Sequence, residues 1–139
     1  MTSRRTFISS ATAASFSLAA LPLKGAGGRK FRTALIGSGW WGMNILREAM
    51  ASGRCQVVAL CDVDENVLAN GIEDVKSESG DAPKGYKDYR DLLAEAKPEV
   101  VIIGTPDQWH ALQSIAACQA GAHVYVEKPT GHTIHESRA

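Results

Sequence analysis

Short apolar runs alternate along the chain with longer segments in which apolar residues recur at every third or fourth position. The short runs predict strands at 33–36, 56–61, 100–103 and 123–126. A further strand is placed at 84–86, the residues that remain between Pro83 and the helix start at Asp88-Tyr89. Helical spacing predicts a helix in each interval, through Ile45, Leu46, Ala49 and Met50, then Leu68, Ile72 and Val75, then Leu92, Leu93 and Ala96, then Leu112, Ile115, Ala116 and Ala120. Strands that are apolar on both faces and alternate with helices are typical of a parallel sheet. The pattern predicts an α/β fold, a Rossmann-like, doubly wound parallel sheet.

A glycine-rich segment joins the first predicted strand to the first predicted helix. It has the sequence Gly37-Ser38-Gly39-Trp40-Trp41-Gly42, and Asp62 stands twenty residues after it, at the end of the second strand. The first glycine permits a tight turn, the second lets the backbone approach a pyrophosphate, and the third lets helix and strand pack closely. In this context the segment predicts a dinucleotide-binding site, in which Trp40 or Trp41 either contacts the pyrophosphate or packs over the loop.

Asp62 is the residue expected to distinguish the two nicotinamide dinucleotides. Its carboxylate can accept hydrogen bonds from both ribose hydroxyls of NAD, and its charge would repel the 2′-phosphate of NADP, for which residues 63–65 offer no arginine. We therefore expect NAD as the cofactor, with NADP disfavoured. A turn or helix-cap role is the alternative for Asp62, although Asp64 leads into the next helix and is expected to be its N-cap. A methyltransferase, whose adenosine site uses a similar loop and acidic residue, is the rival function within this fold.

The turn after the fourth predicted strand has the sequence of a helix start. Thr105 can cap the following helix, Pro106 fits its first turn, and Gln108 completes a capping box. We therefore expect the helix to begin directly after Thr105 and Pro106.

Length and composition indicate one globular domain, since the 139 residues are 45% hydrophobic and 22% charged. The 15 basic and 15 acidic side chains cancel, and no basic stripe with interleaved aromatic residues is present, so we expect no nucleic-acid partner. Cys55, Cys61 and Cys118 lack the paired spacing of zinc or redox motifs and are interpreted as small buried residues. A small-molecule partner is favoured, and no metal site is expected.

The first 28 residues have the pattern of an export signal. Ser3-Arg4-Arg5-Thr6-Phe7-Ile8 places two arginines ahead of a mildly apolar stretch at 11–23, and a glycine-rich linker follows at 25–28. The stretch is shorter than the roughly 20 residues that a spanning helix needs, so no stable membrane span is expected. We predict a twin-arginine signal, export to the periplasm and a nucleotide-binding domain at 29–139. A chance arginine pair, before an anchor or on a cytosolic tail, is the alternative.

Four segments of the chain carry a family signature: 37–42, 59–62, 104–110 and 120–129, with Glu127-Lys128-Pro129 as the most specific part. In this order they resemble the glucose-fructose oxidoreductase and inositol dehydrogenase (Gfo/Idh/MocA) family, and the resemblance covers most of the chain from Phe31 onward. It implies hydride transfer between a nicotinamide cofactor and the carbinol carbon of a sugar or polyol. It also implies that the Lys128-Pro129 peptide bond is cis.

The same resemblance assigns roles around the nicotinamide. Lys128 would be the catalytic residue, reaching the nicotinamide and the reacting hydroxyl of the substrate, and Glu127 would help to line the cofactor site. Thr105, Pro106 and His110 would border the ribose and the nicotinamide. Without the motif, Lys128 would be interpreted as an exposed loop lysine and His110 as a surface or capping histidine.

Members of that family continue into a second, open-sheet domain with the substrate pocket and a catalytic histidine, whereas this sequence stops at Ala139. We therefore expect a sheet truncated after its fifth strand, with 123–126 as an exposed edge, and a chain that is inactive by itself. The second domain would decide the substrate and the oligomeric state. A non-catalytic nucleotide-binding module is the alternative function.

Overall fold

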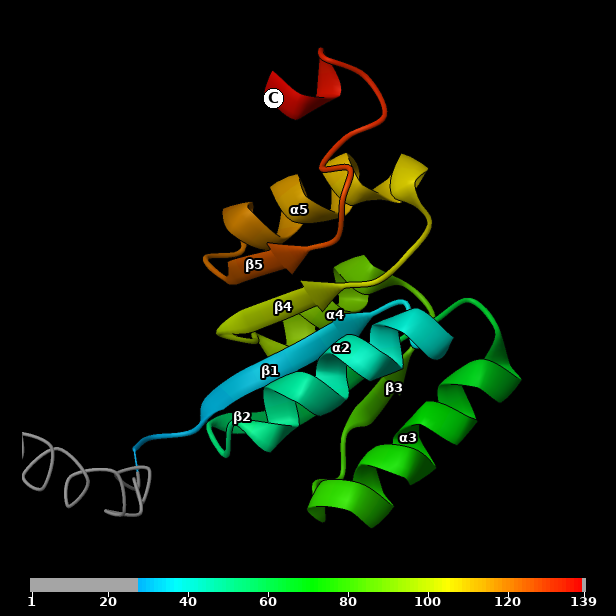
Figure 1. Cartoon of the computed structure of the whole chain (residues 1–139), viewed down its shortest axis with the longest axis vertical. Helices are drawn as coiled ribbons and strands as arrows, with labels where there is room; N and C mark the ends of the chain where they lie inside the picture. Colours follow the sequence, from blue (N-terminus) through cyan, green and yellow to red (C-terminus); the bar gives the residue numbers. More distant parts are fainter. Residues whose placement is uncertain (1–27, 139) are drawn as a thin grey trace, which may run out of the picture.

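Parallel strands with helices on both faces make up residues 28–138, the part of the chain that this computed structural model describes (Figure 1). The strands are β1 (Phe31–Ile36), β2 (Cys55–Cys61), β3 (Lys84–Tyr86), β4 (Val100–Ile103) and β5 (His123–Val126). The helices are α2 (Trp40–Ala51), α3 (Glu65–Ser79), α4 (Tyr89–Ala96) and α5 (His110–Gln119), with the 3-10 turns η1 (Asp107–Trp109) and η2 (Glu136–Arg138). The predicted Rossmann-like α/β fold is confirmed.

The strands are ordered β3-β2-β1-β4-β5, so the chain crosses from one half of the sheet to the other between β3 and β4. Ile36 at the end of β1 pairs in register with Cys61 of β2 and with Ile103 of β4. The carboxyl ends of these three strands therefore lie side by side. Open α/β sheets bind their ligands at this position, where the strand order reverses.

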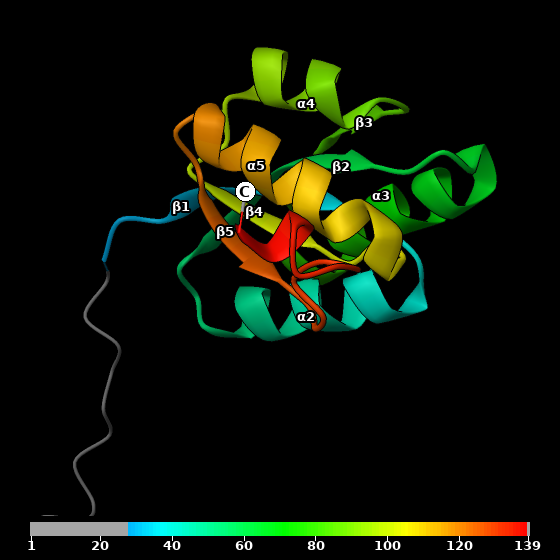
Figure 2. The same cartoon turned by 90° about the horizontal axis from the view of Figure 1, so that it is seen from above.

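Helices cover both faces of the sheet (Figure 2), and an apolar layer lies between the sheet and the helices on each face. Leu35 of β1 faces α2 and α3, where it joins Leu46 and Leu60. The next residue, Ile36, faces α4 and α5 and joins Leu92. All five side chains are at most 2% exposed, and burial of each stabilises the fold by roughly 1.5–3 kcal/mol. The central strand is thus buried on both faces, as the continuous apolar run predicts.

The predicted strand boundaries agree with the structure at 84–86, 100–103 and 123–126, whereas β1 and β2 begin slightly earlier than predicted. The additional residues are the half-buried Phe31, the exposed Arg32 and the buried Cys55, and Phe31 pairs with Cys55 and Arg32 with Gln56. Hydrogen bonding between the two strands, and not an apolar pattern, extends them at this end.

The two predicted helix caps have opposite outcomes. Asp64 caps α3 as predicted, because its carboxylate accepts the backbone N–H groups of Asn66 and Val67 at 2.8 and 3.2 Å. The capping box predicted at Thr105 is wrong. The turn η1 precedes α5, and the Thr105 hydroxyl donates to the amide oxygen of Gln113 at 2.7 Å. The local pattern predicts that the Thr105 hydroxyl bonds to the backbone at the helix start. It bonds instead to the buried side chain of Gln113 on α5.

The apolar face predicted for α5 is also partly wrong. Leu112 is 56% exposed, whereas the buried positions are His110, Ala111, Gln113 and Ala117. Two of these buried residues are polar, and their side chains are hydrogen-bonded inside the protein. A hydrophobicity pattern places polar residues at the surface, so the buried face that it predicts for α5 differs from the observed one.

β5 is an edge strand, as predicted. Within residues 28–138 it pairs with β4 and with no other strand, and His123 and Tyr125 are exposed on it. The loop that follows contains the Lys128-Pro129 peptide bond, which is cis as predicted. The most specific part of the family motif, Glu127-Lys128-Pro129, follows this edge strand directly.

The expected export signal at 1–28 lies outside the described residues, apart from Gly28. No helix within the described range has the length and apolar character needed to cross a membrane.

Candidate functional site

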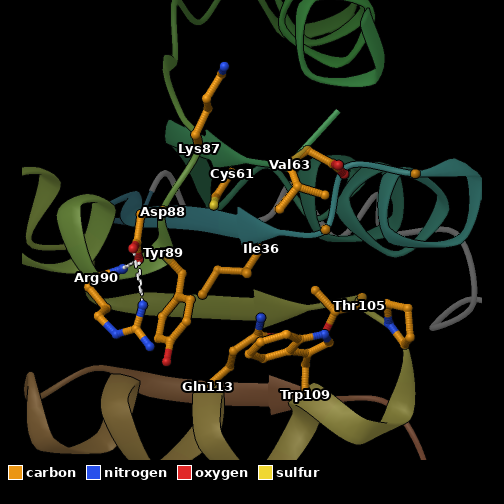
Figure 3. A pocket seen from close by; sticks show the side chains of 15 residues that line it. Ile36, Cys61, Val63, Lys87, Asp88, Tyr89, Arg90, Thr105, Trp109 and Gln113 are labelled. Carbon is orange, nitrogen blue, oxygen red and sulfur yellow. Dashed lines mark hydrogen bonds and ion pairs between the residues drawn. The ribbon is translucent and has the colours of Figure 1, made fainter. Parts of the chain in front are cut away.

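A cavity of about 460 Å³ lies at the carboxyl ends of β1, β2 and β4 (Figure 3). Its walls come from the segments that follow β1, β2, β3 and β4, so residues distant in the sequence meet here. The volume falls in the range of small-molecule sites, and the position is the topological switch point of the sheet. This cavity is the candidate functional site.

Three glycines pack the predicted phosphate loop against the end of β4. Gly37 has a φ of 87°, and a Cβ there would lie 2.8 Å from atoms of Thr105. A Cβ on Gly42 would collide with the carbonyl oxygen of Gly37, and a Cβ on Gly104 would lie 2.6 Å from the Cα of Gly42. The loop, the start of α2 and the end of β4 therefore approach one another too closely for any side chain.

Gly39 differs from these three because nothing in the protein requires it to be glycine. Its φ is −65°, and a Cβ there would meet no atom within 4 Å. Gly39 lines the cavity and is the N-cap of α2, and among the described residues no side chain caps this helix. The backbone N–H groups and the helix dipole favour an anion at this end of α2. The space at Gly39 lets that anion reach the backbone.

Asp62 holds the phosphate loop in place and also lines the cavity. Its Oδ2 accepts the backbone N–H and the hydroxyl of Ser38 at 2.8 and 3.3 Å, and its Oδ1 accepts the N–H of Asp64 at 3.0 Å. A carboxylate has about four lone-pair sites, so Asp62 can accept further hydrogen bonds from a ligand. Ser38 is 3% exposed and is directed at Asp62, which makes it a positioning residue behind the cavity wall.

Two basic residues that the sequence did not indicate, Lys87 and Arg90, also line the cavity (Figure 3). The Lys87 ammonium pairs with Glu65 and lowers the pKa of that carboxyl group. The Arg90 guanidinium contacts both carboxylate oxygens of Asp88, at 3.1 and 3.3 Å. The backbone N–H of Arg90, together with this guanidinium, lowers the pKa of Asp88. The positive charges of Lys87 and Arg90 are therefore each paired with a carboxylate of the protein.

Of the three tryptophans, the two in the phosphate loop lie outside the cavity wall. Trp40 and Trp41 are 76% and 48% exposed, and their ring centroids are 5.4 Å apart. Trp109 of η1 lines the cavity instead, together with Thr105 and Pro106 (Figure 3). The sequence pattern predicts a continuous helix at this position and gives no sign of Trp109 at the site, whereas the extra turn η1 brings the indole to the cavity wall.

His110 does not line the cavity but joins the loop after β4, which does, to the loop after β5. It is 2% exposed; its Nε2 lies 2.8 Å from the carbonyl oxygen of Thr105, and its Nδ1 lies 2.7 Å from that of Pro129. Both partners are acceptors, so a neutral ring donates to one of them and a doubly protonated ring donates to both. The buried imidazole fixes the loop after β5 relative to the loop after β4.

Glu127 and Lys128 follow β5 at the same end of the sheet, outside the cavity wall. Glu127 accepts the hydroxyl of Tyr125 at 3.2 Å, and this hydrogen bond raises the pKa of Tyr125. Lys128 is exposed. The residue next to it, Pro129, is the one that His110 holds, so the position of Lys128 depends on that buried ring.

The cysteines differ in environment more than the sequence suggests. Cys55 and Cys61 are buried as expected, but Cys118 is exposed, which corrects its interpretation as a buried residue. Cys61 lines the cavity, where burial and, secondarily, the neighbouring Asp62 carboxylate raise its pKa to about 12. Burial also raises the pKa of Cys55.

Comparisons with known proteins agree with this geometry. Residues 31–139 match the GFO_IDH_MocA family model, described as an oxidoreductase family with an NAD-binding Rossmann fold. A glycosyl hydrolase family 109 protein of Stenotrophomonas maltophilia is 40% identical over 141 residues, which cover 96% of this chain and 31% of the relative. The chain thus spans about a third of the length of that relative.

Solved structures match the same fold. The myo-inositol 2-dehydrogenase of Lactobacillus plantarum has a TM-score of 0.68 and 30% identity, over 79% of this chain and 31% of the dehydrogenase. The WlbA dehydrogenase of Bordetella pertussis, in complex with NADH and UDP-GlcNAcA, has a TM-score of 0.67 and 27% identity, over 80% of this chain and 32% of WlbA. Each is matched over about a third of its chain.

The difference in cysteine environment predicts a selective alkylation pattern. At pH 8, a thiol with a pKa of about 12 is a thiolate in only about one molecule in ten thousand, and Cys61 is also buried. Iodoacetamide is expected to add one group to the native chain, at Cys118, and three groups after unfolding, as measured by mass spectrometry. The Cys118→Ser variant serves as the control and should stay unmodified while folded. Modification of native Cys61 at a rate similar to Cys118 would contradict the proposed environment.

Proposed function

Because this chain belongs to the Gfo/Idh/MocA oxidoreductase family, whose NAD-binding Rossmann fold matches residues 31–139, we propose that the cavity holds NAD for hydride transfer. The substrate carbon would be a carbinol carbon of a sugar or polyol. One observation carries the proposal: the uncapped start of α2 at Gly39 and the carboxylate of Asp62 line the same cavity. An anion site and a hydroxyl acceptor so arranged match the pyrophosphate and the adenosine ribose of a dinucleotide.

The residues present fit NAD in detail. The backbone N–H groups at the start of α2 would bind the pyrophosphate, and the open space at Gly39 would leave room for it. The free lone pairs of Asp62 would accept the ribose hydroxyls. A 2′-phosphate would meet that negative charge, while Lys87 and Arg90 are already matched by carboxylates. The cavity therefore favours NAD over NADP.

The nicotinamide end of the site would be formed by the loops after β4 and β5. Oxidised nicotinamide, when bound, accepts a hydride from a carbinol carbon, and the reduced form returns it. Thr105 and Pro106 would border the cofactor, and Glu127 would help to line its outer side. Lys128, the first cation after β5, would polarise the reacting oxygen of the substrate. His110 would hold the Lys128 loop through the carbonyl of Pro129.

The substrate class is proposed from the matched proteins. The solved neighbours include a myo-inositol dehydrogenase and a dehydrogenase in complex with a nucleotide sugar acid, and the 40% identical relative is named a glycosyl hydrolase. These names have in common a carbohydrate or a polyol. We propose this class for a protein extended to the length of those relatives, since this chain covers about a third of them.

A second candidate activity follows from the name of the 40% identical relative. Some glycosidases require NAD, so the cofactor site could serve glycoside cleavage instead of net oxidation. The two activities differ in their electron balance. A dehydrogenase produces one NADH for each sugar oxidised, whereas a hydrolase requires the cofactor and leaves none reduced at the end of a turnover.

NADH binding to the 139-residue chain tests the cofactor proposal. Trp109 lines the cavity, so NADH is expected to quench indole fluorescence and to emit by energy transfer. A methyl group in Gly39→Ala would occupy pyrophosphate space and should weaken NADH binding by about tenfold or more, with the melting temperature unchanged. NADPH should also bind about tenfold more weakly than NADH.

Gly42→Ala is the matched control, because its methyl group collides with the Gly37 carbonyl inside the protein. It should lower the melting temperature, whereas Gly39→Ala should not. An unchanged fluorescence signal at millimolar NADH would refute the proposed function. Equal affinity of Gly39→Ala and the original chain would refute the pyrophosphate position.

The role of Lys128 is testable in a protein extended to the length of the relatives. Lys128→Met should lower kcat by about 10²- to 10⁴-fold, because a neutral side chain does not polarise the reacting oxygen. NADH affinity should stay within about twofold, since Lys128 lies outside the cavity wall. Lys30→Met, at the opposite end of the sheet, is the matched control. Turnover unaffected by Lys128→Met would rule out the role, and the NADH formed per sugar consumed distinguishes the two activities.

Export through the twin-arginine route is proposed on the sequence of the first 28 residues. The pair Arg4-Arg5 precedes a mildly apolar stretch too short to span a membrane. Changing both residues to lysine should leave the protein as a precursor in the cytoplasm, as measured by cell fractionation. The unchanged chain should appear in the periplasm. Equal periplasmic amounts of the two forms would exclude this route.

A further inference from the structure

Gln113 is a polar residue buried in the wall of the cavity. It lies on α5, is 5% exposed, and lines the cavity beside Trp109 (Figure 3). Its amide oxygen accepts the hydroxyl of Thr105 at 2.7 Å. This hydrogen bond holds the oxygen end of the amide at Thr105.

The amide nitrogen of Gln113 is the end that the protein leaves without an acceptor, as far as residues 28–138 are concerned. An amide NH₂ carries two donors. Among the described residues, the Ser114 hydroxyl is the only buried side-chain nitrogen or oxygen atom without a hydrogen-bond partner, so the Gln113 nitrogen is accessible from the cavity. The oxygen and the nitrogen diverge from the same carbon, so holding the oxygen at Thr105 directs the nitrogen elsewhere. Figure 3 shows that nitrogen in the space between Trp109 and Ile36.

The position of the adenine follows from the groups that would bind the rest of the dinucleotide. With the pyrophosphate at Gly39 and the ribose at Asp62, the base attached to that ribose lies in the remaining part of the cavity. Its walls there are Val63 after β2, Tyr89 at the start of α4, and Trp109 of η1. Apolar and aromatic walls suit the faces of a purine ring.

We infer that Gln113 recognises the adenine of NAD by donating a hydrogen bond from Nε2 to a ring nitrogen of the base. The inference rests on the proposed function, which places NAD in this cavity. Adenine has ring nitrogens that accept hydrogen bonds, namely N1, N3 and N7, whereas the nicotinamide ring has none. Thr105 is a positioning residue here, because its hydroxyl keeps the amide oxygen away from the base. Gln113 thus determines specificity at the end of the cofactor that does not react.

Binding of cofactor fragments to the 139-residue chain tests this inference. Gln113→Met keeps the size of the side chain and removes the donor, so it should weaken NADH and ADP-ribose by about tenfold each. Reduced nicotinamide mononucleotide, which lacks adenine, should bind both forms equally. Gln113→Glu, which replaces the donor by an acceptor, should lose more affinity for ADP-ribose than Gln113→Met. Gln119→Met, at an exposed position of the same helix, is the matched control.

Chemical changes in the base test the same contact without changing the protein. ADP-ribose analogues with 1-deaza-, 3-deaza- or 7-deaza-adenine each replace one ring nitrogen by C–H. One of the three should bind the original chain about tenfold more weakly than ADP-ribose and show no such loss with Gln113→Met. If Gln113→Met does not fold, the original chain alone still tests the inference, because three analogues that all bind like ADP-ribose would overturn it.

Three results would overturn the inference: equal ADP-ribose affinity of Gln113→Met and the original chain, a Gln113→Glu variant that binds ADP-ribose as tightly as the original, or three deaza analogues that all bind like ADP-ribose. Failure of the original chain to bind NADH is a separate result. It would refute the proposed function and this inference with it, whereas the three results above would overturn the inference alone.

Discussion

The close contact between the phosphate loop and the end of β4 is the constraint on which the site depends. No side chain fits at Gly37, Gly42 or Gly104, because each faces backbone or side-chain atoms of the neighbouring segment at less than a normal contact distance. This contact fixes the start of α2 over the switch point of the sheet. It also fixes Thr105, which occupies the space in front of Gly37. The anion site and the loop after β4 are therefore one rigid arrangement.

Thr105 extends this arrangement to the rest of the site through two different groups. Its hydroxyl orients the amide of Gln113, and its carbonyl oxygen lies beside the ring of His110. That ring also reaches the carbonyl of Pro129, next to Lys128. Buried polar side chains of this kind fix a geometry because every alternative leaves a donor or an acceptor unsatisfied. Thr105 thus helps to position both proposed ends of the cofactor site, the adenine end through Gln113 and the nicotinamide end through His110.

Charge matching defines what the cavity can accept. Lys87 and Arg90 each contact a carboxylate of the protein, whereas Asp62 receives hydrogen bonds only from Ser38 and Asp64 within the described range. The cavity wall therefore offers a carboxylate to a ligand and no unmatched cation. Neutral hydroxyls are favoured near Asp62, and the negative charge of the ligand belongs at the start of α2.

Local sequence patterns determined the order of elements, the glycine-rich turn before α2 and the cap at Asp64, because each depends on residues close together in the chain. The same patterns failed on α5, where they assigned Thr105 to a helix cap and treated Leu112 as buried. Tertiary structure decided the roles of Gln113, His110 and Arg90. A hydrophobicity pattern expects polar residues at the surface, and whether one is buried depends on partners that only the folded chain brings together. For His110 that partner is a carbonyl 19 residues away, at Pro129.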